Sequence, residues 1–125
     1  MSAVRRKAGR LVPLELAICE AALELHDHGE EPFHGYELAK ALRRASDARL
    51  LTAYGTLYRA LGRLERMGFL ESRWEDPAIS ARENRPGRRL YTLTAAGATA
   101  TRQALNEQSE AAAALRKRRR RLAPA

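Results

Sequence analysis

The side chains best suited to chemistry in this sequence are hydrogen-bond donors and cations, gathered in two places. One group comprises Thr56, Tyr58 and Arg59. The other is a run of four arginines between residues 82 and 89, opposed by Glu83 alone. Hydroxyl and guanidinium groups donate to phosphate oxygens and base edges, and crowded arginines repel one another unless they meet anions. Both groups therefore indicate that the chain binds a polyanion.

The distribution of charge supports this interpretation more than the formal net charge of +8 does. Residues 11–39 contain seven acids and neither lysine nor arginine, whereas residues 40–89 contain twelve bases and six acids. Two further basic segments lie at 1–10 and 116–121. This distribution of positive charge attracts polyanions. Nucleic acid is the first candidate partner, and an anionic membrane is the second. The terminal arginines are equally well explained as solvated tails.

Other classes of function find little support in the residues. The chain has no glycine-rich phosphate loop, no nucleophile elbow and no serine with a plausible base, so we expect no enzyme and no cofactor. Cys19 with His26, His28 and His34 matches no zinc spacing, so we expect no metal. The single cysteine, the lack of a secretory signal and the lack of a long apolar run predict a cytoplasmic protein that is not in the membrane.

The elements that must position these side chains can be predicted from periodicity, prolines, glycines and caps. Three helices are expected first, at 13–27, 35–45 and 53–67. A strand at 69–75, a polar loop at 76–87 and a second strand at 88–93 follow. The last helix is expected from Thr94 to about Leu115. The predicted fold is mainly α with a small antiparallel β-hairpin: a winged helix-turn-helix plus a C-terminal dimerisation helix. The expected segments are a flexible basic arm at 1–12, a DNA-binding domain at 13–94, the dimerisation helix at 95–115 and a basic tail at 116–125.

Two helices indicate a homodimer. The helix at 13–27 carries Leu16, Cys19 and Leu23 outside its main apolar stripe, so we expect it to bury a second surface against another chain. The last helix is rich in alanine, with Leu105 and Leu115 as its only large apolar residues before residue 116. Alone it would be marginally stable, so it also requires a partner surface.

Three stretches together resemble one known family. They are His34-Gly-Tyr-Glu-Leu38, Gly55-Thr-Leu-Tyr-Arg-Ala-Leu61 continuing to Leu70, and Arg88-Arg-Leu-Tyr-Thr-Leu-Thr-Ala-Ala-Gly97. In this order they are similar to the PadR family of bacterial transcriptional regulators, in its short subfamily with a single C-terminal helix. The resemblance covers roughly residues 13–97. It implies a dimeric repressor that binds a pseudo-palindromic operator, reads it with the third helix, and is released by a small-molecule effector that remains unidentified.

The sequence departs from the family pattern at two places. Ala53 and Tyr54 stand where members usually have Ser-Pro, and this substitution puts Tyr54 at the expected DNA-facing tip. The last helix lacks the aromatic residue that drug-binding members place at the dimer centre, so the effector-binding residues stay unknown. The predicted DNA-binding residues are Tyr36, Tyr54, Thr56, Tyr58, Arg59, Arg85, Arg88 and Arg89.

Several of these residues have a structural alternative. Tyr36 contacts DNA or is half-buried between helices, and Arg63 and Arg66 are best explained as a solvated face. Within the loop, Arg85 and Arg88 are the preferred pair for phosphate or minor-groove contact. Trp74 is expected to pack against the hairpin or the last helix. The rival function for the whole chain is a winged-helix module that binds a protein partner without sequence-specific DNA binding.

Overall fold

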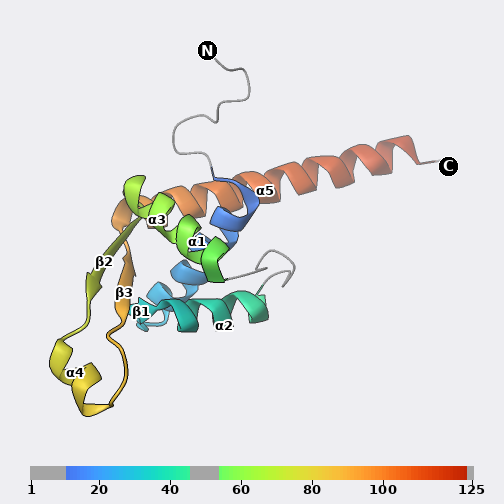
Figure 1. Ribbon diagram of the computed structural model, residues 1–125. Helices are drawn as coiled ribbons and strands as arrows, with labels where there is room; N and C mark the ends of the chain where they lie inside the picture. Colours follow the sequence, from blue (N-terminus) through green and yellow to red (C-terminus); the bar gives the residue numbers. More distant parts are fainter. Residues whose placement is uncertain (1–10, 46–53, 124–125) are drawn as a thin grey trace.

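The computed structural model describes residues 11–45 and 54–123 (Figure 1). Five helices and three short strands make up this part of the chain, in the order α1 (Pro13–Asp27), β1 (Phe33–His34), α2 (Gly35–Ala45), α3 (Tyr54–Arg66), β2 (Leu70–Trp74), α4 (Pro77–Arg82), β3 (Arg89–Leu93) and α5 (Ala95–Leu122). The predicted fold class, mainly helical with a small antiparallel sheet, is confirmed. Residues 1–10 of the expected arm and residues 124–125 lie outside the described residues.

The sheet has three strands in the order β1-β3-β2, all antiparallel. Its β2–β3 register pairs Leu70 with Leu93 and Trp74 with Arg89. The sequence predicted only these two strands, because β1 is two residues long and leaves no periodic pattern. Phe33 of β1 is fully buried beside Tyr91, which explains why the turn before α2 joins the sheet.

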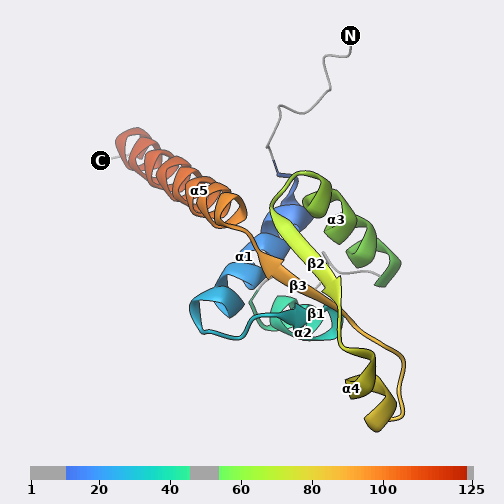
Figure 2. The same ribbon diagram turned by 90° about the vertical axis from the view of Figure 1, so that its left-hand side faces the viewer.

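Helix α1 lies in the middle of the body, in contact with α2, α3, α5 and β3 (Figure 2). Ile18, Cys19 and Ala22 are completely buried there, and Leu23 is buried as well. Of the three residues expected outside the main stripe, Cys19 and Leu23 are thus buried within the single chain, whereas Leu16 is only partly buried. Burial of Cys19 and Leu23 therefore requires no second chain, contrary to the expectation from sequence. The chain's own helices and sheet cover the apolar side of α1, and Glu20 and Glu24 stay exposed.

A buried carboxylate ties α1 to α3. Glu15 is 1% exposed; its Oε1 accepts a hydrogen bond from the Val12 backbone N–H at 3.0 Å. Its Oε2 lies 3.0 Å from Nε of Arg63 in α3. A carboxylate this deeply buried is tolerated only when it is paired. Arg63, whose side chain is 47% exposed, thus combines the solvated position expected from sequence with a structural role.

The segment 75–88, which joins β2 to β3, is the wing. It was expected to be a polar loop, and this was wrong because its first half forms α4, from Pro77 to Arg82. The Asp76 side chain caps the helix by accepting from the Ala78 N–H at 2.9 Å, and Pro77 occupies its first turn. Both are standard signals for a helix start, and a single short helix leaves no periodicity to find.

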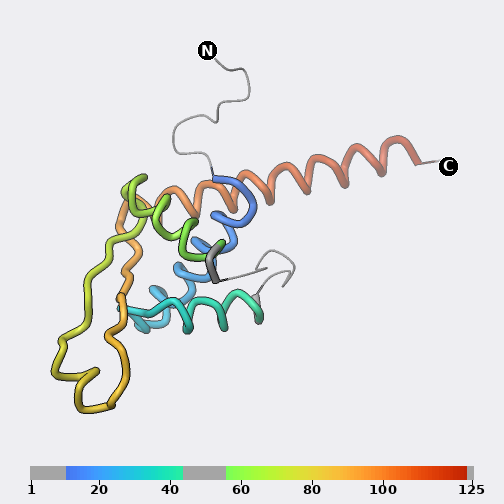
Figure 3. The backbone as a smooth tube through the Cα atoms, viewed as in Figure 1, coloured from blue at the N-terminus to red at the C-terminus, as the bar shows by residue number. Residues whose placement is uncertain are grey.

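Helix α5 begins as predicted, with the Thr94 side chain accepting from the Gly97 N–H at 2.9 Å. It continues past Leu115 to Leu122, so the basic run 116–121 is helical instead of a separate tail. Alanine and arginine are strong helix formers, and cations are favourable near a helix C-terminus. Beyond residue 105 every described residue of α5 is exposed, and the helix projects from the body as a rod (Figures 1 and 3). None of the helices in the described part of the chain is both long enough and apolar enough to span a membrane.

Candidate nucleic-acid interface

Helix α3 separates an apolar face from a polar one. Leu57, Leu61 and Leu64 are fully buried against the body, as the 3–4 spacing predicted. Thr56, Tyr58 and Arg59 therefore lie toward solvent, and Tyr58 is 46% exposed. Nη2 of Arg59 donates to Oγ1 of Thr56 at 3.4 Å, and the other guanidinium donors form no hydrogen bond or ion pair with the described residues. This face can donate to base edges and phosphates.

The position of Tyr58 depends on Gly35, the first residue of α2. The Tyr58 hydroxyl lies so close to Gly35 that a Cβ at residue 35 would collide with the hydroxyl and the end of the ring. Helices α2 and α3 therefore contact each other where the Tyr58 phenol packs against the Gly35 backbone. This contact is a reason for the glycine in the His-Gly-Tyr sequence.

The start of α2 places Tyr36 on the surface. The His34 N–H donates to Oε1 of Glu37 at 3.0 Å, and the Glu37 N–H donates to Nδ1 of His34 at 3.4 Å. Burial lowers the pKa of His34, which favours the neutral imidazole that accepts this bond. Tyr36 is 53% exposed, stacks on His34 and lies under the ammonium of Lys40. Tyr36 is therefore exposed at the surface and not half-buried.

Tyr54 is the first residue of α3, but its side chain lies outside what the structure describes. Its predicted DNA contact thus rests on sequence position alone.

The wing is closed by a carboxylate at its base. Glu75 accepts from Nη1 and Nη2 of Arg85, at 2.6 and 3.1 Å, and its Oε1 also accepts from the Arg88 N–H at 3.0 Å. The Arg85 hydrogen bonds hold the pKa of Glu75 below its usual value. Arg85 donates in addition to Glu83 and to the Pro86 carbonyl. Its donors are therefore directed into the wing itself.

The remaining predicted arginines differ from Arg85 and from each other. Arg88 is exposed, and its guanidinium forms no ion pair within the described part of the chain. Arg89 donates through Nε to Oγ of Ser72 at 3.0 Å and stacks over Trp74 at 5.2 Å. Trp74 itself is 64% exposed, so the expectation that it packs against the hairpin or α5 was wrong.

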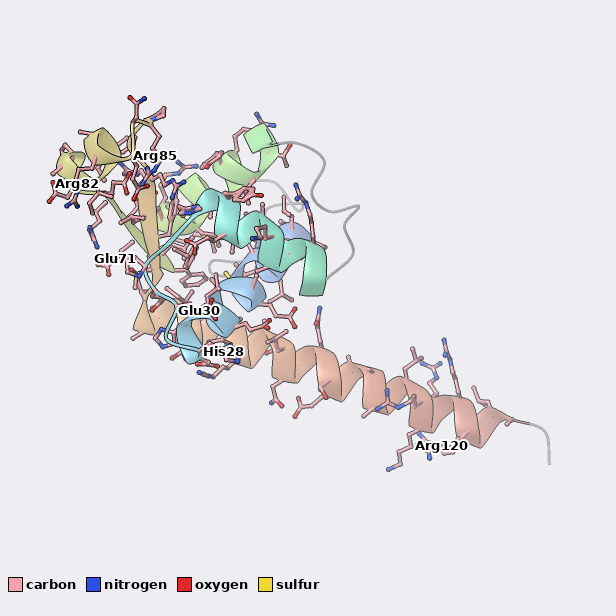
Figure 4. All side chains as sticks on the ribbon, turned by 90° about the horizontal axis from the view of Figure 1, so that it is seen from below. His28, Glu30, Glu71, Arg82, Arg85 and Arg120 are labelled. Atoms are coloured by element: carbon pink, nitrogen blue, oxygen red, sulfur yellow. The ribbon has the colours of Figure 1, made fainter. Side chains whose placement is uncertain are left out.

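Helix α3 and the wing lie on the same side of the body (Figure 2). Oγ of Ser72 on β2 donates to Oε2 of Glu65 on α3 at 2.6 Å, so the strand that carries the wing is bonded to the helix. Arg82 and Arg85 lie at this end of the molecule, whereas Arg120 lies at the far end of α5 (Figure 4). The basic wing and the basic helix end are thus two separate surfaces.

The described residues indicate no metal site. They contain no group of three or more potential metal-ligating side chains. Instead, Nδ1 of His26 lies 2.7 Å from Glu31, and Nδ1 of His28 lies 2.7 Å from the Glu24 carbonyl. An open hollow of about 310 Å³ lies on the outer sheet face, lined by Glu71, Ser72, Arg73, Leu90 and Thr92.

Comparison with known proteins agrees with this geometry. The sequence model described as "Transcriptional regulator PadR-like family" matches residues 24–103. A PadR-like transcription factor from Bacteroides fragilis has a similar structure, with 26% identity, a TM-score of 0.60 and coverage of 82% of this chain and 87% of that one. A transcriptional regulator from Clostridium thermocellum is similar over 83% and 87%, with 23% identity and a TM-score of 0.61.

A Streptococcus transcriptional regulator is similar over 85% of this chain and 99% of its own, with 23% identity and a TM-score of 0.54. The two likenesses at 23% identity support the fold alone. No curated protein matches the chain.

Proposed function

Since the chain belongs to the PadR-like family of transcriptional regulators, we propose that it is a dimeric, sequence-specific repressor that binds duplex DNA in the cytoplasm. The observation that carries this proposal is the shared orientation of two features. Helix α3, on which Tyr58 is exposed, and a wing closed by the Glu75–Arg85 pair lie on one side of the body. In a winged helix-turn-helix this side meets the groove and the adjacent backbone.

Each predicted residue has a proposed role in this interface. Thr56, Tyr58 and Arg59 contact base edges and nearby phosphates in the major groove. Tyr36 contacts the DNA backbone from the start of α2, and Tyr54 is included on its position in the sequence alone. Arg88 is the wing's phosphate contact, because it is exposed beside the anchored Arg85. Arg85 fixes the shape of the wing, and Arg89 acts from the adjoining strand.

Helix α5 is the proposed dimerisation element. Leu105 is half-buried against the body, and the same 3–4 stripe continues along the projecting rod through Ala112, Leu115 and Leu122. Leu115 and Leu122 are exposed in the single chain, although leucines at such spacing normally pack against another helix. A second copy of the chain covers this stripe in the proposed repressor.

A small-molecule effector is part of the proposal. A ligand that changes the angle between the two protomers would change the distance between the two recognition helices. Operator half-sites are a helical turn apart, so such a change lowers DNA affinity. The residues that bind this effector stay unknown.

Selection of duplexes from a random-sequence pool tests the function, with sedimentation testing the dimer. The proposal expects an enriched pseudo-palindrome and a dimeric chain. Leu115→Glu should shift the chain toward monomer, whereas Ala113→Glu, on the opposite face of α5, should not. Absence of any enriched sequence would support the rival, a winged-helix module that binds protein.

A further inference from the structure

Trp74 is the largest aromatic side chain in the sequence and is also exposed. It lies at the end of β2 with 64% of its surface accessible, directly opposite Arg89 of β3. The Arg89 guanidinium lies over the indole, 5.2 Å from the ring centroid. Burying an indole is strongly favourable, so a partner that covers Trp74 would gain binding energy.

The Trp74–Arg89 pair is fixed relative to α3. Nε of Arg89 donates to Oγ of Ser72, and that hydroxyl donates to Glu65 of α3. Nη2 of Arg89 also lies 3.9 Å from the Glu65 carboxylate. The guanidinium is therefore held in place by the proposed recognition helix itself. Such preorganisation reduces the entropy lost when a ligand binds.

Strand alternation assigns the pair to the side of α3. Leu70, Ser72 and Trp74 share one face of β2, where Leu70 is buried and Ser72 bonds to α3. Glu71 and Arg73 share the opposite face, at the open hollow on the outer side of the sheet. Trp74 thus extends the exposed face of α3 toward the wing.

We propose that Trp74 and Arg89 form a stacked unit that contacts the sugar–phosphate backbone of duplex DNA between α3 and the wing. The indole lies against a deoxyribose, and the guanidinium donors not used by Ser72 bind the neighbouring phosphate. Guanidinium groups have five N–H donors, so one can bind Ser72 and a phosphate together. This inference rests on the proposed DNA-binding function and adds a contact that the sequence analysis assigned to packing.

Duplex DNA is the occupant that the surroundings favour. Arg89 follows the exposed Arg88 in the chain and is linked through Ser72 to α3. The Arg89 guanidinium and the Trp74 ring are therefore next to the proposed DNA interface. A phosphate backbone provides the anion for the guanidinium and an apolar sugar edge for the ring.

Fluorescence offers a direct test, because Trp74 is the only tryptophan in the chain. The full-length chain is titrated with a duplex that it has selected from a random pool, and anisotropy of a labelled copy of that duplex reports binding. The inference expects a shift in tryptophan emission with the same midpoint as the anisotropy change. It also expects acrylamide to quench the bound form less than the free form.

Substitutions then distinguish the loss of a DNA contact from damage to the fold. Trp74→Ala should weaken duplex binding about tenfold, as the loss of one aromatic contact does, and Trp74→Phe should recover most of the loss. Arg89→Ala should weaken binding similarly. Arg73→Ala is the matched control, since it removes the same charge from the opposite sheet face and should weaken binding far less. Thermal unfolding of each variant shows that the fold is retained.

The possible results distinguish this inference from the proposed function. If the wild-type chain binds no duplex, the function fails and the inference with it. If the duplex binds but acrylamide quenching is unchanged and Trp74→Ala binds normally, the inference alone is overturned. A change in Trp74 emission caused by an aromatic small molecule and not by DNA would also overturn it.

Discussion

Arg85 and Glu75 form a two-pronged ion pair across the base of the wing, with N–O distances of 2.6 and 3.1 Å. The pair joins residues on opposite sides of α4, and the Arg88 N–H bonds to the same carboxylate. Arg85 is one of the arginines that sequence alone suggested for DNA contact. We propose instead that Arg85 fixes the Glu75 carboxylate, which in turn binds the Arg88 N–H.

The first prediction asks whether Glu75 affects DNA binding by positioning the wing or only through its negative charge. Glu75→Gln removes an acid near the proposed interface, so electrostatics alone would strengthen DNA binding. We expect weaker binding, because the amide cannot accept two Arg85 donors and the Arg88 backbone as a carboxylate does. Duplex titration by anisotropy provides the measurement.

Glu83→Gln is the matched control for this prediction. Glu83 also pairs with Arg85, at 2.8 Å, but its side chain is exposed and the Glu75 bonds survive its loss. Its removal should leave duplex affinity unchanged or slightly increased. Equal weakening by both variants would refute a special role for Glu75.

A second prediction concerns Gly35 and Tyr58. Gly35→Ala places a methyl group where the Tyr58 hydroxyl lies, so the half-exposed ring must move. We expect a loss of about 1–3 kcal/mol of binding free energy, the range for one lost base contact. In a Tyr58→Ala background the same glycine change should add nothing further. Additive losses in this double-mutant cycle would show that the two residues act separately.

The third prediction concerns how closely α5 packs on the body. A Cβ at Gly97 would collide with the Phe69 carbonyl, a backbone atom that cannot move aside cheaply. Gly97→Ala should therefore lower the free energy of unfolding by about 1–3 kcal/mol, as overpacking does. Denaturant titration measures this.

Gly62→Ala provides the comparison for Gly97→Ala. Its Cβ would meet only the end of the Arg66 side chain at 3.5 Å, within helix α3. Alanine is the better helix former, so this variant should be more stable than wild type by about 0.5–1 kcal/mol. Destabilisation by both variants to the same extent would contradict the packing argument.

A fourth prediction concerns alkaline pH. Burial raises the pKa of the Cys19 thiol from 9.0 to about 11. The folded chain then holds a proton that the unfolded chain releases, so stability is present below pH 9 and is lost as the pH rises toward 11. Burial raises the pKa of Tyr91 too, which adds a loss of the same sign.

Unfolding curves measured from pH 8 upward for wild type and Cys19→Ala isolate the thiol. The alanine variant should keep only the shallower decline, because it has no thiol to titrate. Parallel curves for the two proteins would exclude Cys19 as a source of the pH dependence.

Much of the fold could be predicted from local signals. The spacing of Leu57, Leu61 and Leu64 predicted the buried face of α3, and Thr94 predicted the start of α5. These features are encoded within a few residues. The order of the longer helices and of the β2–β3 hairpin also followed from periodicity and caps, and the structure confirms that order. The resemblance of three short motifs to a family is confirmed by the family comparison.

The remaining features depend on contacts between distant residues, which sequence patterns do not reveal. Nothing in the local sequence indicates that Glu75 would bind Arg85. Nor does it indicate that Trp74 would be exposed at the surface with Arg89 stacked over its ring. The burial of Cys19 inside one chain depends on where α5 and the sheet pack. Composition alone could not distinguish that arrangement from a dimer surface.

The salt dependence of duplex binding tests the central claim most directly. For a chain that contacts several phosphates through α3 and the wing, affinity should fall steeply as salt rises. Arg88→Ala should reduce the slope of log affinity against log salt by about one. Arg102→Ala, which removes an α5 arginine paired with Asp27 away from the wing, should leave the slope unchanged. A flat slope for wild type, or equal changes for both variants, would contradict the account.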